Sequence, residues 1–110
     1  MLHYSDLTPE QKKIICNGCG PKGNMVPVPD FLFTASCDQH DFHYWRGCTE
    51  ADRFHADNEF LLAMIKDAGN DEALREIARF YFMAVRTWGW TCFHYADHQR
   101  DENDLPKNKS

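Results

Sequence analysis

The sequence predicts a small all-α domain of three or four helices. Side chains that cap helices stand at three expected helix starts, Thr8, Thr49 and either Asn70 or Asp71. Apolar residues recur at helical spacing after the last two starts, and no segment shows a clear strand pattern. The chain of 110 residues is 43% hydrophobic and 14% aromatic, which is unlike a disordered polypeptide and is enough for one modest core.

The first helix is expected at 9–16, because Thr8 suits the N-cap and Pro9 suits the first helical position. A glycine-rich segment, 18–23, follows it and predicts a tight loop. The stretch 26–29 has two prolines, each of which pushes its preceding residue out of the helical region, so we expect it to be extended.

Three longer helices should follow this loop, each bounded by residue types that begin or end helices. Threonine, asparagine or aspartate precedes the last two of them, and Gly47 and Gly69 follow the first two. We expect these helices at 33–45, from 49 to 66 or 67, and from 70 or 71 to 88 or 89, or on to 95 past a distortion.

The pattern favours one domain over 1–98 and a flexible tail over 99–110. The tail is charged, contains Pro106 and lacks apolar periodicity. No stretch approaches the ~20 apolar residues of a transmembrane helix, and the first residues lack the apolar core of a secretory signal. The net charge of −5 without a basic cluster argues against nucleic acid as a partner. Localisation and oligomeric state stay undetermined.

The second expected helix carries a group of polar residues that suits chemistry. His40 and Tyr44 are four residues apart and share a face, with Cys37 nearby, whereas Asp41 is rotated from His40 by about 100°. The helix therefore points an imidazole and a carboxylate in neighbouring directions. An isolated pair of this kind is more often part of a solvent-facing helix than a site.

The glycine-rich loop before this helix favours a functional site over a solvent-facing helix. Glycines accept the dihedral angles that turn carbonyl oxygens inward, and Gly18, Gly20 and Gly23 lie in this loop. Calcium takes roughly six to eight oxygen ligands, commonly carbonyls with a carboxylate, whereas magnesium prefers octahedral order and several waters. The loop together with Asp41 therefore favours a calcium site.

Together these residues resemble the phospholipase A2 superfamily. Its catalytic helix carries Cys-x-x-His-Asp-x-x-Tyr, matched from Cys37 to Tyr44, and its calcium loop carries Cys-Gly-x-Gly or a close variant, matched by Cys19, Gly20 and Gly23. The resemblance covers about half the chain and is strongest to the bacterial and fungal secreted members. Animal and venom enzymes carry further cysteines where this chain has Ser36 and His43.

The resemblance implies roles for particular residues. His40 would be the general base, Asp57 would orient it, and Tyr44 would hydrogen-bond that aspartate. Asp57 is favoured over Asp52 because an Asp-x-x-Phe pattern runs from Asp57 to Phe60. The implied reaction is hydrolysis of the sn-2 ester of a glycerophospholipid at a membrane or micelle surface.

The resemblance also implies a metal and a disulfide. Ca²⁺ would be held by Asp41 and the carbonyl groups of Gly18, Gly20 and Lys22, although Gly23 is an alternative to Lys22. A disulfide would join Cys19 to Cys37, and two buried thiols are the alternative.

Two other functions fit the same sequence. One is a non-catalytic module of the same fold that binds calcium, lipid or a protein. The other is a zinc or redox site at Cys16 and Cys19, which no second Cys-x-x-Cys supports. Relatives of the resembled family are usually secreted.

Overall fold

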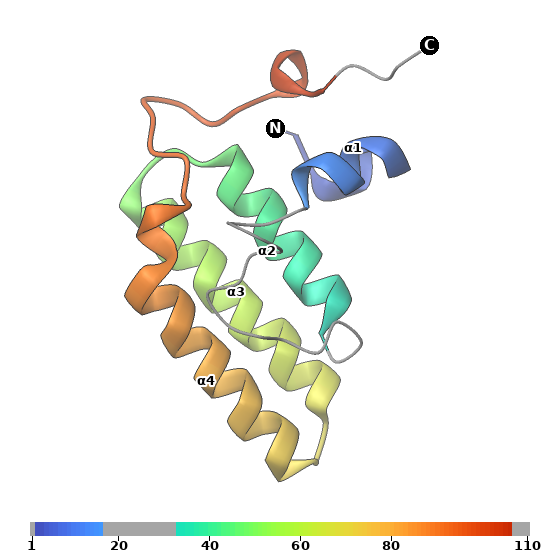
Figure 1. Ribbon diagram of the computed structural model, residues 1–110, viewed down its shortest axis with the longest axis vertical. Helices are drawn as coiled ribbons and strands as arrows, with labels where there is room; N and C mark the ends of the chain where they lie inside the picture. The colour runs from blue at the N-terminus through green and yellow to red at the C-terminus, as the bar shows by residue number, and fades with distance from the viewer. Residues whose placement is uncertain (1, 17–32, 107–110) are drawn as a thin grey trace.

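Three long helices lie side by side, and a short helix packs against the first of them (Figure 1). The computed structural model describes residues 2–16 and 33–106. Within these ranges the chain is helical and forms no strand beyond an isolated bridge between Cys48 and Tyr95, which confirms the all-α class. The helices are α1 (Pro9–Ile15), α2 (Thr34–Arg46), α3 (Glu50–Ala68) and α4 (Glu72–Trp88), with 3₁₀ turns η1 (Tyr4–Asp6), η3 (Gly89–Thr91) and η4 (Glu102–Asp104).

The expected caps begin three of these helices. Thr8 accepts a hydrogen bond from the backbone of Gln11 at the start of α1. Thr49 and Asp52 form a reciprocal capping box at the start of α3, and Asp71 caps α4. Because each cap satisfies backbone N–H groups that the first turn leaves unpaired, these starts could be located from local sequence.

Glycine is required between α2 and α3. Gly47 has a φ of 74°, and a Cβ there would lie 2.0 Å from the backbone oxygen of His94. The segment around His94 therefore packs directly on the α2–α3 turn, and the N–H of Cys48 donates to the His94 carbonyl at 2.9 Å. This close approach sets how α2 and α3 meet at the end nearest Tyr44.

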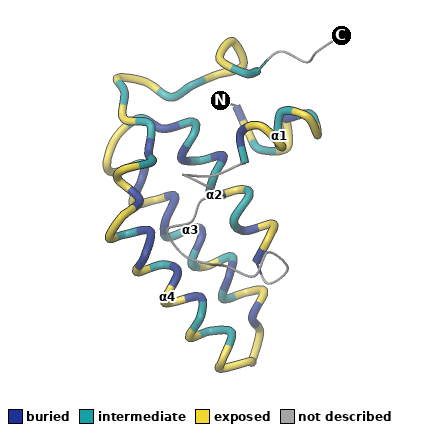
Figure 2. The backbone as a smooth tube through the Cα atoms, viewed as in Figure 1, coloured by how far each residue is buried: buried dark blue, intermediate teal, exposed yellow. Residues whose placement is uncertain are grey.

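Buried residues recur along the facing sides of the three long helices (Figure 2). The main cluster lies between the start of α2 and the facing sides of α3 and α4. A second cluster fixes the N-terminal segment to the other side of α2 through Phe42, which is fully buried. The main cluster consists of Phe33, Phe60, Met64, Ala78, Tyr81 and Val85.

The described part of the expected flexible tail contacts α1 and α2. Arg100 donates a backbone hydrogen bond to Arg46 and a side-chain hydrogen bond to Trp45, both on α2. Leu105 packs on the N-terminal cluster, and Gln11 donates to the carbonyl of Pro106 at 3.2 Å. Leu105, the side chain of Arg100 and backbone groups make these contacts, and the flexibility of the tail stays a prediction. Residues 107–110 lie outside the described ranges.

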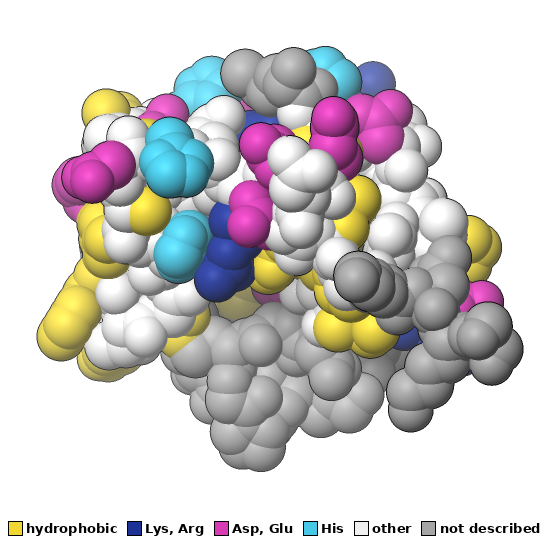
Figure 3. All heavy atoms as spheres, turned by 90° about the horizontal axis from the view of Figure 1, so that it is seen from above, with side chains coloured by type: hydrophobic (Ala, Val, Ile, Leu, Met, Phe, Trp, Pro, Cys, Tyr) yellow, Lys and Arg dark blue, Asp and Glu magenta, His cyan; other side chains and the backbone are white. Residues whose placement is uncertain are grey.

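The described surface is of mixed character. On the face seen in Figure 3, acidic, histidine and basic side chains lie beside one another, with hydrophobic groups along the edge. Within 2–16 and 33–106, no helix combines the length and apolar character needed to cross a bilayer.

Candidate functional site

The antiparallel packing of α2 and α3 brings His40 and Asp57 together. The Nε2 atom of His40 lies 2.7 Å from Oδ1 of Asp57, and both side chains are buried. The hydroxyl of Tyr44 donates to the same oxygen at 2.6 Å. Phe60 stacks on the His40 ring with 4.4 Å between centroids. The structure thus joins the three residues that the helix spacing and the Asp-x-x-Phe pattern had singled out, whereas Asp52 caps α3 instead.

The contact with Asp57 sets the tautomer of His40. An ionised carboxylate only accepts hydrogen bonds, so Nε2 carries the ring proton and Nδ1 keeps a lone pair. Burial lowers the pKa of His40, and this effect outweighs the hydrogen bond and charge of Asp57, which raise it. His40 is therefore a neutral imidazole at neutral pH, and one nitrogen is ready to take a proton.

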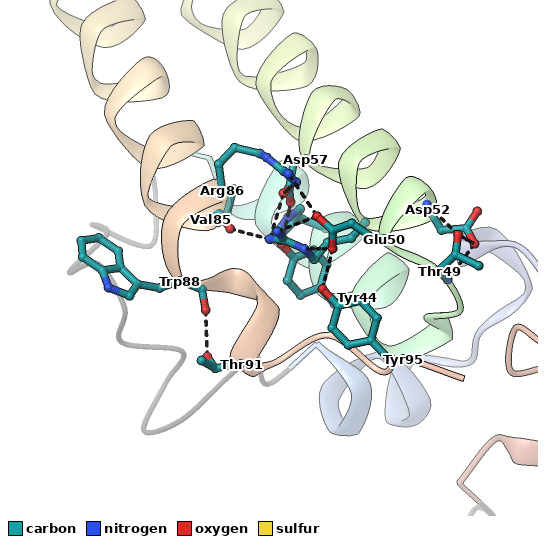
Figure 4. A network of polar contacts seen from close by, with 12 residues as sticks. Tyr44, Thr49, Glu50, Asp52, Asp57, Val85, Arg86, Trp88, Thr91 and Tyr95 are labelled. Atoms are coloured by element: carbon teal, nitrogen blue, oxygen red, sulfur yellow. Dashed lines mark hydrogen bonds and ion pairs between the residues drawn. The ribbon is translucent and has the colours of Figure 1, made fainter. Parts of the chain in front are cut away.

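Asp57 is surrounded by hydrogen-bond donors. Besides His40 and Tyr44 at Oδ1, Arg86 donates to Oδ2 at 2.7 Å, and Nη1 of Arg53 lies 3.5 Å from it (Figure 4). Burial alone would raise the pKa of Asp57, but the hydrogen bonds and charges of its partners lower it below its ordinary value. The side chain that holds His40 is therefore an ionised carboxylate inside the protein.

Sequence reasoning missed the arginines at this site. Arg53 could have been found, because it lies four residues before Asp57 on the same helical face, where a buried charge needs a partner. Arg86 could not, because it comes from α4, 29 residues beyond Asp57, and its neighbours gave no local indication. Glu50 was also missed, and it accepts from both arginines.

A hollow beside His40 gives the buried imidazole access to water-sized space. It lies between α2 and α3, and its size is sufficient for ordered water. Its walls are formed by Ser36, Gln39, His40, His43, Ala56, Glu59, Phe60 and Ala63.

Asp41, the next residue after His40, has different surroundings. Burial, and then the charge of Asp38, raise the pKa of Asp41 to about 7. Within the described residues no donor reaches its carboxylate. A carboxylate that is costly to ionise and receives no donor from the described part of the chain suits an added cation, and hard divalent ions such as calcium prefer oxygen ligands. The chemistry of Asp41 therefore fits the metal that the sequence implied.

The rest of the expected calcium site lies outside the described residues, namely Gly18, Gly20 and Lys22. Within the described ranges, no three His, Cys, Asp or Glu side chains are grouped to hold a metal ion. The calcium site thus stays a prediction that depends on Asp41. The disulfide expected between Cys19 and Cys37 stays a prediction, because Cys19 lies outside the described residues.

The described surroundings of Cys16 favour the thiol over the thiolate. Its Sγ donates to the backbone carbonyl of Asp38 at 3.1 Å. Burial, and then the charges of Asp38 and Asp41, raise the pKa of Cys16 to about 12. Metal binding and thiol exchange both require the thiolate, which this environment disfavours.

No family model, characterised protein or solved structure matches this chain. The geometry itself defines a buried His–Asp pair next to Asp41, a carboxylate of raised pKa. The functional argument therefore rests on these residues.

Proposed function

We propose that this protein is a calcium-dependent hydrolase of the sn-2 ester of glycerophospholipids, similar to the bacterial and fungal secreted phospholipases A2. The observation that carries the proposal is the 2.7 Å hydrogen bond between His40 and buried Asp57. Asp41, the residue after that base, supplies a carboxylate of raised pKa. This combination supports a base-activated water acting beside a bound cation.

His40 performs the proton transfers. Its Nδ1 takes a proton from water while the water oxygen forms a bond to the ester carbonyl carbon. Asp57 stabilises the resulting imidazolium through Nε2–H and stays ionised itself. When the bond from the carbonyl carbon to the glycerol oxygen breaks, His40 returns the proton to that oxygen. The products are a fatty acid and a lysophospholipid, and His40 is regenerated.

Asp41 would hold the calcium ion, with the loop carbonyls expected at Gly18, Gly20 and Lys22 completing its shell. A bound calcium ion supplies positive charge for the substrate phosphate and for the oxygen of the attacked carbonyl. Asp41 then exchanges a costly buried charge for a neutralised one, which is consistent with its raised pKa.

The test is fatty acid release from phospholipid micelles in calcium by the wild type and by His40→Gln. We expect the substitution to lower the rate by about 10²- to 10⁴-fold, the range for loss of a general base. His55→Gln is the matched control, because the side chain of His55 on α3 is 75% exposed and lies 3.8 Å from Glu59, outside the hydrogen bonds of His40 and Asp57. It should leave the rate unchanged.

Two results would count against the hydrolase. Unchanged turnover in His40→Gln would remove His40 as the base. Calcium binding by a wild type that releases no fatty acid would favour the non-catalytic module instead.

A further inference from the structure

The inference starts from how the two oxygens of Asp57 are divided. Oδ1 accepts from His40 and Tyr44, which belong to the site already described. Oδ2 faces the other way and accepts from Nη1 of Arg86 at 2.7 Å. Among the described residues, this is the shortest contact to Oδ2, since Arg53 lies 3.5 Å away. One oxygen thus faces the base, and the other faces α4.

Arg86 reaches Asp57 already oriented. Its Nη2 donates to Oε2 of Glu50 at 3.2 Å, and its guanidinium lies 5.0 Å from the centre of the Phe54 ring. Only 24% of the side chain is exposed, and Figure 4 shows it extending from α4 to Asp57. A guanidinium held by a carboxylate and an aromatic face loses little freedom when it makes its last hydrogen bond.

Arg53 cannot take over this task in its observed position. Its Nη1 donates to the Val85 carbonyl at 2.9 Å, and its Nε and Nη2 form a two-point contact with Glu50. The donors of Arg53 are therefore committed to other acceptors. Of these two arginines, Arg86 makes the short contact that can orient the Asp57 carboxylate.

A carboxylate can rotate about its Cβ–Cγ bond, and such rotation would turn Oδ1 away from His40. A strong, charge-assisted donor at Oδ2 opposes this rotation and compensates the buried charge. Two carboxylates, Asp57 and Glu50, and two guanidinium groups, Arg53 and Arg86, lie together, so the cluster has zero net charge. Asp57 therefore keeps its charge and its direction when His40 accepts a proton.

We propose that Arg86 is a positioning residue of the hydrolase, which holds Asp57 ionised and oriented so that Oδ1 receives Nε2–H of His40 and Nδ1 faces the reacting water. This rests on the proposed function for its catalytic consequence. The orientation of His40 by Asp57 and Arg86 can be measured without turnover.

The first experiment separates orientation from substrate binding. We expect Arg86→Gln to lower kcat by about 10- to 100-fold on phospholipid micelles, the size expected from a misplaced catalytic group, with KM little changed. Arg86→Lys keeps the positive charge but not the forked geometry, so its kcat should lie between that of the wild type and that of Arg86→Gln. Arg79→Gln is the control, because Arg79 is exposed on the same helix and pairs with Glu76. It should match the wild type.

The second experiment follows the Nε2 proton of His40 by NMR. In the wild type this proton should give a downfield, slowly exchanging resonance, identified by its loss in His40→Gln. Arg86→Gln should weaken or remove the resonance, whereas Arg79→Gln should keep it. A resonance that is unchanged in Arg86→Gln, or an unchanged kcat, would overturn the proposal.

The two experiments also distinguish the ways of failing. If the wild type releases no fatty acid, the proposed function fails, and the Nε2 resonance alone decides whether Arg86 orients the pair. If Arg86→Gln does not fold, Arg86→Lys takes its place: a wild-type kcat and resonance there would overturn a role for the forked guanidinium.

Discussion

His40 and Asp41 are neighbours on α2, yet their environments are opposites. His40 faces α3, where Asp57, Tyr44 and two arginines form a closed set of hydrogen bonds and ion pairs. Asp41 faces the side of Cys16 and Asp38, where burial and like charge raise its pKa to about 7. One helix thus holds a polar network of hydrogen bonds and ion pairs on one face and, on another, a carboxylate of raised pKa that receives no donor from the described residues.

This difference indicates that the His40 side and the Asp41 side of the candidate site interact with different partners. The His40 side is satisfied by protein groups alone, so it should be structured without metal. On the Asp41 side, burial and the charge of Asp38 make the Asp41 carboxylate costly to ionise, and the proposed calcium ion would offset that cost. Substitutions on the two sides should therefore change different quantities.

After His40→Gln, the largest expected effect comes from Asp41→Asn. Fatty acid release in calcium should fall by about 10²- to 10³-fold, the range for loss of an electrostatic stabiliser, and calcium binding by calorimetry should weaken in parallel. Asp97→Asn, at an exposed position, should change neither. Calcium affinity that is equal in Asp41→Asn and the wild type would show that the two faces are not divided as described.

Asp41→Asn should also change how the stability of the folded protein depends on pH. Because the folded pKa of Asp41 is raised to about 7, its contribution to stability is lost as the pH rises from its ordinary value of 3.8 through 7. Without calcium at pH 8, Asp41→Asn should therefore resist urea better than the wild type. A clear loss of stability at pH 8 would mean that the carboxylate has a partner in the protein.

A smaller effect should separate two tyrosines that both donate to carboxylates. Tyr44→Phe leaves buried Asp57 short of one donor, which should cost about 1–3 kcal/mol in the free energy of unfolding. Tyr95→Phe removes the donor to the exposed Glu50 and should cost less, because water can replace the hydroxyl. Urea unfolding of both variants checks this order, and equal costs would contradict the closed, buried character of the His40 side.

The smallest effect concerns pH. Burial, and then the charges of Arg46 and His40, lower the pKa of His43 to about 4. The unfolded chain takes up this proton near pH 6.5, so stability is lost as the pH falls from 6.5 towards 4. His43→Gln should therefore lose less stability between pH 7 and 5 than the wild type does, whereas His98→Gln, at an exposed position, should lose as much. Equal losses in His43→Gln and the wild type would place His43 in solvent.

Local sequence was sufficient for most of the fold. The caps at Thr8, Thr49 and Asp71 and the stops at Gly47 and Gly69 act through neighbouring backbone groups, so the helix bounds could be predicted within a residue or two. The packed segment 99–106 could not, because its contacts reach α1 and α2 from the far end of the chain.

The site divides in the same way. The shared face of His40 and Tyr44 was predictable because residues four apart on a helix lie on one side, whereas Asp57 was implied by the family resemblance, through the pattern that ends at Phe60. Arg86 meets Asp57 only through the packing of α4 on α3, which no spacing within one helix reveals. The calcium ligands expected at 18–22 lie outside the described residues and stay predictions.

The most direct test uses a phosphatidylcholine labelled in its sn-2 acyl chain, incubated with the wild type first in calcium and then in a chelator. The account predicts labelled fatty acid and unlabelled lysophospholipid in calcium, and neither product once the metal is removed. Label that stays in the intact lipid at every calcium concentration, with the protein folded, would contradict it.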